Sequence, residues 1–185
     1  TDDVTWLGAF FHSVSARTAG FSTYPLGTFS NAGLFALTIL MFIGASPGST
    51  GGGIKTSTFF TLVQSMRSAL NKKHFGAFRR SLSKETLSKA YLITLLSLCV
   101  VCTGTFVLGI LEPHLSLMQL LFEVTSAFGT VGLSTGITPN LCDASKLVVT
   151  LIMFIGRLGA LPMLTIWINR PEQQARYTEE SITIG

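Results

Sequence analysis

The sequence predicts an all-α membrane protein built from two similar helical repeats, and three observations lead to this fold class. Only 12% of the 185 residues are charged and 48% are hydrophobic, with a mean hydropathy of +0.53, whereas soluble domains carry about 25% charged residues. Residues 90–111 form an uncharged run, and about 20 apolar residues are enough to cross a bilayer. The third observation is a pattern of small residues, Thr-x-Gly-x-Ser-Thr, that occurs twice and indicates a duplicated architecture.

The first repeat is expected within residues 1–68. Residues 4–15 are apolar but too few to cross a bilayer, which favours a short re-entrant helix. A stretch of small residues and an outer turn follow, and a second apolar run then extends over 34–43. A glycine-rich segment interrupts this run, and the helix is predicted to resume over 54–66. The first repeat is therefore predicted to have a broken inner helix.

The segment 69–89 is predicted to be a basic cytoplasmic linker. Between positions 67 and 89 the chain has seven of its 13 basic residues and a single acid, Glu85. A basic cluster is also found in nucleic-acid-binding proteins, but beside membrane spans it indicates a cytoplasmic loop by the positive-inside rule. No nucleic-acid partner is expected. The basic residues are Arg67, Lys72, Lys73, Arg79, Arg80, Lys84 and Lys89.

The second repeat is predicted over residues 90–168. The span at 90–111 comes first, and a short helix over 117–128 leads into a loop that contains Thr-Val-Gly. A polar turn precedes the last span, 147–168. The polar tail 169–185 is expected to lie in the cytoplasm, because a span, a re-entrant hairpin and a second span bring the chain back to the side of the basic linker.

A constant offset of 112 residues relates the two repeats. The Thr-x-Gly-x-Ser-Thr pattern at 18–23 matches the one at 130–135. The same offset, without a gap, aligns Met-Phe-Ile-Gly at 41–44 with Met-Phe-Ile-Gly at 153–156. Each repeat is therefore predicted to contain a short helix, a small-residue loop and a long second helix.

The two Thr-x-Gly loops are candidate binding segments for a monovalent cation. Thr-Val-Gly at 130–132 is similar to the filter of potassium channels, in which backbone carbonyls replace the hydration shell of the ion. Glycine lets the backbone turn its carbonyls toward an axis without a Cβ clash, and threonine adds a hydroxyl at the inner end. The opposing interpretation is two ordinary loops at helix ends. The candidate filter residues are Thr18, Ala19, Gly20, Phe21, Thr130, Val131, Gly132 and Leu133.

The glycine-rich segment is a candidate gate. It resembles a phosphate-binding loop at first, but a Walker loop needs Gly-Lys-Ser/Thr in succession, and Ile54 separates Gly53 from Lys55. Irregular backbone at membrane depth is tolerated where protein buries it or where it lines a water-filled path. The candidate gate residues are Gly44, Ala45, Ser46, Pro47, Gly48, Ser49, Thr50, Gly51, Gly52 and Gly53, together with Arg157.

Arg157 lies near the middle of the predicted last span, where a charge is costly unless it is paired or hydrated. The offset of 112 residues aligns it with Ala45, so one repeat breaks its helix at the depth where the other carries a buried cation. Its expected partners are carbonyls of the glycine-rich loop or an acid elsewhere in the protein. Two roles stay open, an electrostatic barrier below the filter and a helix-packing contact without a part in transport.

Three more charged residues and the histidines complete the candidates. Arg17 and Glu123 lie near the two loops, where they either brace the loops as an ion pair or meet solvent or partner helices. Lys55 is expected to extend its side chain to the inner membrane boundary. The histidines show no ligand spacing, so no metal is expected apart from transported K⁺.

The residues quoted above resemble the superfamily of K⁺ transporters that includes KtrB, TrkH and the plant HKT proteins. The motifs that carry the resemblance are Ser-Ala-Arg-Thr-Ala-Gly-Phe at 15–21, the glycine-rich segment at 42–55 and Phe-Gly-Thr-Val-Gly-Leu-Ser at 128–134. Within the superfamily, the glycine-rich segment and the tail pattern at 176–185 are most similar to bacterial KtrB.

The resemblance implies four helix–pore-loop–helix repeats around one pore, with one filter segment from each. The chain would supply the third and fourth repeats, with an intramembrane gating loop in the third and an arginine, Arg157, in the fourth. It further implies homodimers in the bacterial cell membrane, a cytosolic ring of nucleotide-binding KtrA-type regulatory subunits, and uptake that Na⁺ activates.

The chain begins at what would be the third pore helix, so an N-terminal half with the first two repeats is an expected partner. The function that follows is K⁺ uptake by a pore-forming subunit, and no enzymatic activity is expected. The alternative is a membrane anchor or assembly subunit that conducts no ions. A nucleotide-binding enzyme is excluded by the motif spacing and by the hydropathy.

Overall fold

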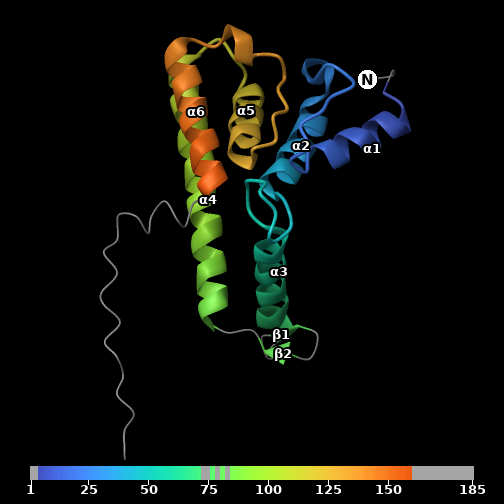
Figure 1. The fold of residues 1–185 in the computed structure, drawn as a ribbon, viewed down its shortest axis with the longest axis vertical. Coiled ribbons are helices and arrows are strands. Elements are labelled where there is room, and N and C mark those ends of the chain that lie inside the picture. The colour runs from blue at the N-terminus through green and yellow to red at the C-terminus, as the bar shows by residue number, and fades with distance from the viewer. Residues whose placement is uncertain (1–3, 72–75, 78–79, 82–83, 160–185) are drawn as a thin grey trace, which may run out of the picture.

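The structure, a computed structural model, describes residues 4–71, 76–77, 80–81 and 84–159. This part of the chain is helical, as predicted, apart from one short hairpin (Figure 1). The elements in order are α1 (Trp6–Ser15), η1 (Leu26–Thr28), α2 (Asn31–Phe42), α3 (Thr56–Asn71), β1 (Gly76–Ala77), β2 (Arg80–Ser81), α4 (Lys84–Leu111), α5 (Leu117–Gly129), η2 (Thr138–Asn140) and α6 (Asp143–Leu158).

The predicted linker is less irregular than its composition indicates. Helix α3 extends into it as far as Asn71, and α4 already begins at Lys84. Between them, β1 and β2 pair antiparallel, with Gly76 opposite Ser81 and Ala77 opposite Arg80. The hairpin was not predicted, because two residues on each strand are too few to give a recognisable alternation of apolar and polar side chains.

The order of elements repeats at the offset seen in the sequence. The two 3-10 helices begin at residues 26 and 138, and helices α2 and α6 begin at 31 and 143. Even the helix caps correspond. The side chains of Ser30 and Cys142 accept hydrogen bonds from the backbone N–H groups of Gly33 and Ser145, which satisfies a donor that the first turn leaves free.

Among the described residues, α4 is the helix that is long and apolar enough to cross a membrane, over Glu85–Leu111. Helix α6 differs from the predicted span at 147–168. It begins earlier, at Asp143, and ends at Leu158, where Gly159 has a φ of +88° that the helix cannot continue. Residues 160–168 lie outside the described part of the chain. Arg157 is consequently in the last turn of α6 and not near the middle of a helix.

Helix α5 lies at the centre of the described core, between the α4–α6 pair and α2 (Figure 1). Every residue from Phe122 to Gly129 is buried. One apolar cluster joins α5 to α4 and α6 and includes Leu108, Val124 and Ile152, and a second joins it to α2 and to the loop after α5. The last turns of α5, which lead into the Thr-Val-Gly loop, are therefore enclosed by packed side chains.

The inner helix of the first repeat is broken between Phe42 and Thr56, as predicted, but the break is closed at its base. The N–H of Gly44 donates to the carbonyl of Ile54 at 2.8 Å, and the N–H of Ile54 donates to the carbonyl of Phe42 at 3.0 Å. This parallel bridge between Ile43 and Ile54 moves the start of α3 from the predicted residue 54 to Thr56. The intervening residues form a closed loop that begins and ends at nearly the same point.

Candidate functional site

The two Thr-x-Gly loops have the same unusual backbone. Thr18 and Thr130 have φ values of +69° and +52°, although they are not glycines, and Gly20 and Gly132 have φ values of +79° and +90°. The residue between each pair has a negative φ, so the sign alternates along both loops. Alternation of this kind turns successive N–H groups to one side of the backbone. Both loops follow directly after a short helix, α1 or α5.

The side chains of the second loop show which side is packed. Val131 and Leu133 are 5% and 3% exposed and join the cluster formed with α2 and α5, whereas Gly132 between them is exposed. Phe21, the corresponding residue of the first loop after Gly20, is 70% exposed. The Thr-Val-Gly loop is thus anchored through its apolar side chains, and the first loop has fewer such anchors within the described residues.

The two loops touch each other through backbone atoms. A Cβ placed on Gly20 would lie 2.1 Å from the carbonyl oxygen of Val131 and 3.6 Å from the Cα of Gly132. No side chain fits there, so a glycine is required at position 20 both by its φ and by this close approach. The contact brings three of the eight predicted filter residues together, Gly20 from the first loop and Val131 and Gly132 from the second.

The glycine-rich loop lies directly against the threonine ends of both Thr-x-Gly loops. The N–H of Gly52 donates to the Thr130 hydroxyl at 2.8 Å. A Cβ placed on Gly51 would lie 2.9 Å from the Thr18 hydroxyl oxygen. The loop therefore reaches the hydroxyl groups of both threonines, and the predicted filter and the predicted gate form one continuous cluster.

Three cationic side chains bind carbonyl groups of the glycine-rich loop. Arg157 donates to the carbonyl of Thr50 at the tip of the loop, which is the kind of partner that the sequence predicted. Lys55 donates to the carbonyl of Ser49 at 3.0 Å and to that of Gly51 at 2.5 Å. The expectation that Lys55 extends to the membrane boundary is therefore wrong. The loop folds back over its own end, and its free carbonyls accept from the ammonium group.

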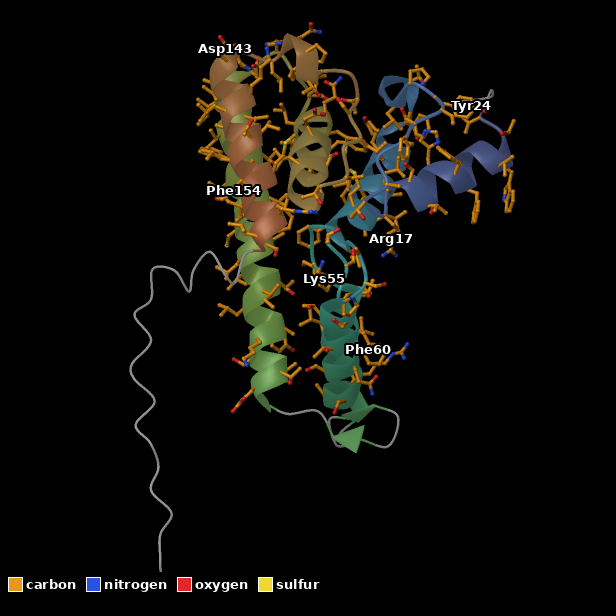
Figure 2. The ribbon with its side chains drawn as sticks, in the orientation of Figure 1. Arg17, Tyr24, Lys55, Phe60, Asp143 and Phe154 are labelled. Carbon is orange, nitrogen blue, oxygen red and sulfur yellow. The ribbon has the colours of Figure 1, made fainter. Side chains whose placement is uncertain are left out.

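Arg17 binds the loop at its other end. Its Nη1 donates to the carbonyls of Ile43 at 3.0 Å and Gly44 at 3.3 Å. Figure 2 shows Arg17 at the end of α1 and Lys55 inside the loop. The contact of Arg17 was not predicted. A broken helix leaves carbonyl groups that need donors, which is a general signal for such a contact but does not say which cation supplies them.

Arg17 and Glu123 do not form the ion pair that was offered as one possibility. Glu123 is 5% exposed and accepts a hydrogen bond from the hydroxyl of Thr138, in the segment after the second Thr-x-Gly loop. The two charged groups therefore serve different repeats. Arg17 binds carbonyls at the break in the inner helix of the first repeat, and Glu123 binds the segment that follows the second Thr-x-Gly loop.

The exposure of Arg157 also differs from the expectation of a buried cation. Its side chain is exposed in the described part of the chain, beside a polar hollow of about 360 Å³ between the glycine-rich loop and the end of α6. Thr50, Lys55 and Gly159 are among the residues that line this hollow. The guanidinium therefore lines this hollow and is bound to the Thr50 carbonyl. Within the described ranges, no group of His, Cys, Asp and Glu residues is placed to hold a metal ion.

Short helices that end at glycine loops, with an irregular segment between two further helices beneath them, are typical of membrane transport proteins. The family model described as TrkH, cation transport protein, matches residues 4–177. The chain therefore belongs to this family of cation transporters, and the resemblance inferred from the motifs is confirmed.

Several curated relatives are similar over nearly the whole chain. The Ktr system potassium uptake protein D of Bacillus subtilis is 42% identical over 99% of this chain and 41% of its own length. The Ktr system potassium uptake protein B of Vibrio alginolyticus is 40% identical over 97% of this chain and 40% of its length. The potassium/sodium uptake protein NtpJ of Enterococcus hirae is 41% identical over 95% of this chain and 41% of its length. The chain thus spans about two fifths of these relatives.

The fold is also that of a solved transporter. The crystal structure of the potassium transporter TrkH from Vibrio parahaemolyticus matches with a TM-score of 0.71 over 87% of this chain and 36% of that chain. The sequences are 20% identical in this comparison, so the match bears on the fold. It supports the prediction of a helical fold.

Proposed function

We propose that the chain forms part of a K⁺-conducting pore, in which the two Thr-x-Gly loops supply carbonyls of a selectivity filter. One observation carries the proposal. Both loops have the alternating φ signs of a carbonyl filter, and both touch each other and the glycine-rich loop. Relatives that match the chain are named potassium uptake proteins, which supports K⁺ as the ion.

In this proposal the filter works through backbone dipoles. Carbonyl oxygens replace the water around a dehydrated cation, and several weak sites in a row let the ion leave again quickly. The carbonyls of residues 18–21 and 130–133 would form two of the walls. The side chains of Val131 and Leu133 are buried, so packing holds the carbonyl positions without placing a charge beside the ion.

The glycine-rich loop is proposed to gate the pore below the filter. It touches the hydroxyls of Thr18 and Thr130, which mark the inner end of the filter. Arg157 binds the tip of the loop through the Thr50 carbonyl and adds a positive charge that repels an approaching cation. Opening requires the hydrogen bonds of Gly52 and Thr50 to break, and a bond to a charged group contributes about 1.5–3 kcal/mol.

The complete transporter is proposed to contain more than this chain. The chain would supply the third and fourth repeats, and an N-terminal half would supply the first and second. We further propose homodimers in the bacterial cell membrane, with the linker at 69–89 and the tail at 169–185 in the cytoplasm against a nucleotide-binding KtrA-type ring. Activation by Na⁺ is part of the proposal, since one relative is named a potassium/sodium uptake protein.

The test is uptake of radiolabelled Rb⁺ by proteoliposomes that contain the full-length transporter, with and without its cytosolic ring. Deletion of residues 45–53 is expected to raise the flux strongly, because it removes the loop that closes the inner end of the filter. An unchanged flux would contradict a gating role. Substitution of Arg157 by glutamine is expected to raise flux as well, and an unaltered flux would favour a packing role for this arginine.

The alternative function, a membrane anchor or assembly subunit, is distinguished by selectivity. Gly132 has a φ of +90° and lies exposed between the anchored side chains of Val131 and Leu133. If its carbonyl belongs to a filter, Gly132→Ser should reduce the preference for K⁺ over Na⁺ in competition uptake. An anchor subunit would show the same ion preference with either residue.

A further inference from the structure

The broken inner helix of the first repeat leaves carbonyl groups without helical partners. An α-helix ends with four carbonyls that no N–H of the same helix can reach, and α2 ends at Phe42. At the base of the glycine-rich loop, the carbonyls of Phe42 and Ile54 accept hydrogen bonds from the N–H groups of Ile54 and Gly44. In the described residues, no backbone N–H outside the helices donates to the carbonyls of Ile43 and Gly44.

Arg17 supplies the missing donors. It follows the C-terminal cap of α1, and its backbone N–H is fixed by the carbonyl of Val14 at 3.0 Å. From there its Nη1 reaches 26 and 27 residues along the chain to Ile43 and Gly44. A guanidinium carries its donors in a planar fork, and one of its nitrogens, Nη1, makes both contacts.

The second repeat serves as an internal comparison. The offset of 112 residues places Gly129 opposite Arg17, and the inner helix of that repeat continues through the corresponding position, where the carbonyl of Ile155 accepts from the N–H of Gly159 at 2.9 Å. The repeat whose inner helix is unbroken at this level has no side chain at the position of the arginine. The repeat whose inner helix is broken has the arginine and uses it on the exposed carbonyls.

We infer that Arg17 is a positioning residue for the gate, which holds the first hinge of the glycine-rich loop against the filter. The inference rests on the proposed gating function and goes beyond it, because it concerns a different end of the loop from Arg157. Arg17 directly precedes Thr18 in the chain, so movement of the hinge displaces the start of the first filter loop. Arg17 holds the hinge at Ile43 and Gly44, and Arg157 holds the tip at Thr50.

The first experiment is a pair of substitutions in the full-length transporter, measured as Rb⁺ uptake. Arg17→Gln removes the charge and both contacts. It should raise flux about tenfold, because the closed loop loses the stabilisation that a hydrogen bond to a charged group provides. Arg17→Lys keeps the charge but loses the planar fork, so an intermediate rise is expected. Provided that deletion of residues 45–53 raises the flux, wild-type flux in both variants overturns the inference, and wild-type flux in Arg17→Lys alone shows that only the charge matters and overturns it too.

The second experiment repeats Arg17→Gln in the transporter that lacks residues 45–53. Ile43 and Gly44 remain in this background, but the loop that they connect to the filter is absent, so the substitution should leave the flux of the deletion variant unchanged. An equal rise in both backgrounds would mean that Arg17 acts on the ion directly and not through the loop. The preference for K⁺ over Na⁺ should not change, because its loss would assign Arg17 to the filter.

A readout independent of flux separates this inference from the gating proposal. Spin labels at Ser46 and at Thr50 report the mobility of the hinge and of the tip in the otherwise intact transporter. Arg17→Gln should free the label at Ser46 more than the label at Thr50, and Arg157→Gln should do the reverse. Unchanged mobility at Ser46 overturns the inference that Arg17 holds the hinge. If instead mobility at Ser46 rises while deletion of the loop leaves flux unchanged, Arg17 does hold the hinge and the gating proposal fails.

Discussion

Gly20 and Gly132 occupy equivalent positions in the two repeats but have different surroundings. Both have a positive φ, which costs a residue with a Cβ about 1–2 kcal/mol. At Gly20 a Cβ would also lie 2.1 Å from the carbonyl oxygen of Val131, whereas at Gly132 no atom lies within 4 Å. Alanine at position 20 must therefore displace a carbonyl of the other loop, and alanine at position 132 must only accept strain.

This difference predicts unequal effects on selectivity. Gly20→Ala should reduce the ratio of K⁺ to Na⁺ uptake further than Gly132→Ala, because it moves the Val131 carbonyl from its position. The measurement is competition uptake in proteoliposomes, with protein amounts matched by quantitative blotting. Equal loss in the two variants would indicate that backbone strain, and not the contact between the loops, controls selectivity.

Glu112 connects the end of α4 to the start of α6 outside the spanning segment. The N–H of Cys142 donates to its Oε1 at 2.7 Å, and this bond, with one from Ser145 and the nearby His114, lowers the pKa of the carboxyl below its ordinary value of 4.5. A lowered folded-state pKa means that the unfolded chain binds the proton more tightly. The stabilisation is present above pH 4.5 and is lost as the pH falls through the folded-state pKa.

A pH series tests this connection. The melting temperature of the detergent-solubilised transporter should fall more steeply below pH 4.5 than that of Glu112→Gln, whose amide does not titrate. Asp143→Asn is the matched control, since Asp143 lies at the same helix end, is exposed and is only 3.9 Å from the exposed Lys146, and such surface pairs contribute little. Parallel curves for the wild type and Glu112→Gln would contradict the role of Glu112.

At the scale of elements, the backbones of α6 and α5 come close together at Gly156. A Cβ placed on Gly156 would lie 2.0 Å from the carbonyl oxygen of Phe128 and 2.8 Å from its carbonyl carbon. Backbone atoms in a packed helix cannot move aside. Gly156→Ala should therefore push the last turn of α6 outward and cost on the order of 1–3 kcal/mol, as overpacked cores do.

A glycine in α4 provides the control for this prediction. A Cβ on Gly109 would meet only a Leu120 methyl at 3.9 Å, an ordinary contact. Gly109→Ala should be neutral or stabilising by up to about 1 kcal/mol, because alanine favours the helix. Thermal unfolding of the two variants in the same detergent is the measurement. Stability losses of equal size would show that the close approach of α6 to α5 is not responsible.

The sequence predicted the elements better than it predicted their ends. Hydropathy and the repeat located α1, α2, α4 and α5, because each is an apolar run between small or polar residues. The sequence-based prediction placed the start of α3 two residues early, because the bridge between Ile43 and Ile54 depends on two segments that meet only in the folded structure. It carried α6 beyond Leu158, because apolar residues continue past Gly159 and only the backbone conformation there ends the helix.

The same limit applies to the site. The residues of the two Thr-x-Gly loops and of the glycine-rich loop were all selected from the pattern, and the structure brings most of them together, although their assignment as filter and gate stays a prediction. The partners of the cations were harder to predict. Arg17 and Lys55 bind carbonyls, and every residue has a carbonyl, so the sequence alone gives no means of choosing the right one.

At the scale of the whole molecule, the described residues leave one side of the site without neighbours. Trp6, Leu7 and Phe10 on α1 are 81%, 70% and 55% exposed, and Phe21 in the first Thr-x-Gly loop is 70% exposed. Contiguous apolar surface of this kind marks an interface or a membrane contact. The relatives are more than twice as long as this chain. We expect that a segment corresponding to their additional length covers this apolar surface.

Two Thr-x-Gly loops surround only part of an ion, so the proposed pore requires the loops of an N-terminal half. Expressed alone, the chain should insert into membranes without supporting Rb⁺ uptake. Co-expressed as a separate chain with the preceding part of the transporter, it should restore uptake, because the exposed apolar side of α1 and Phe21 then finds its partner surface. The pair carrying Gly132→Ser serves as the control, since a Cβ at this position meets no atom within 4 Å and the pair should assemble equally well but lose ion preference. Uptake by this chain alone, with the same ion preference as the pair, would show that two loops suffice and would contradict a pore of four repeats.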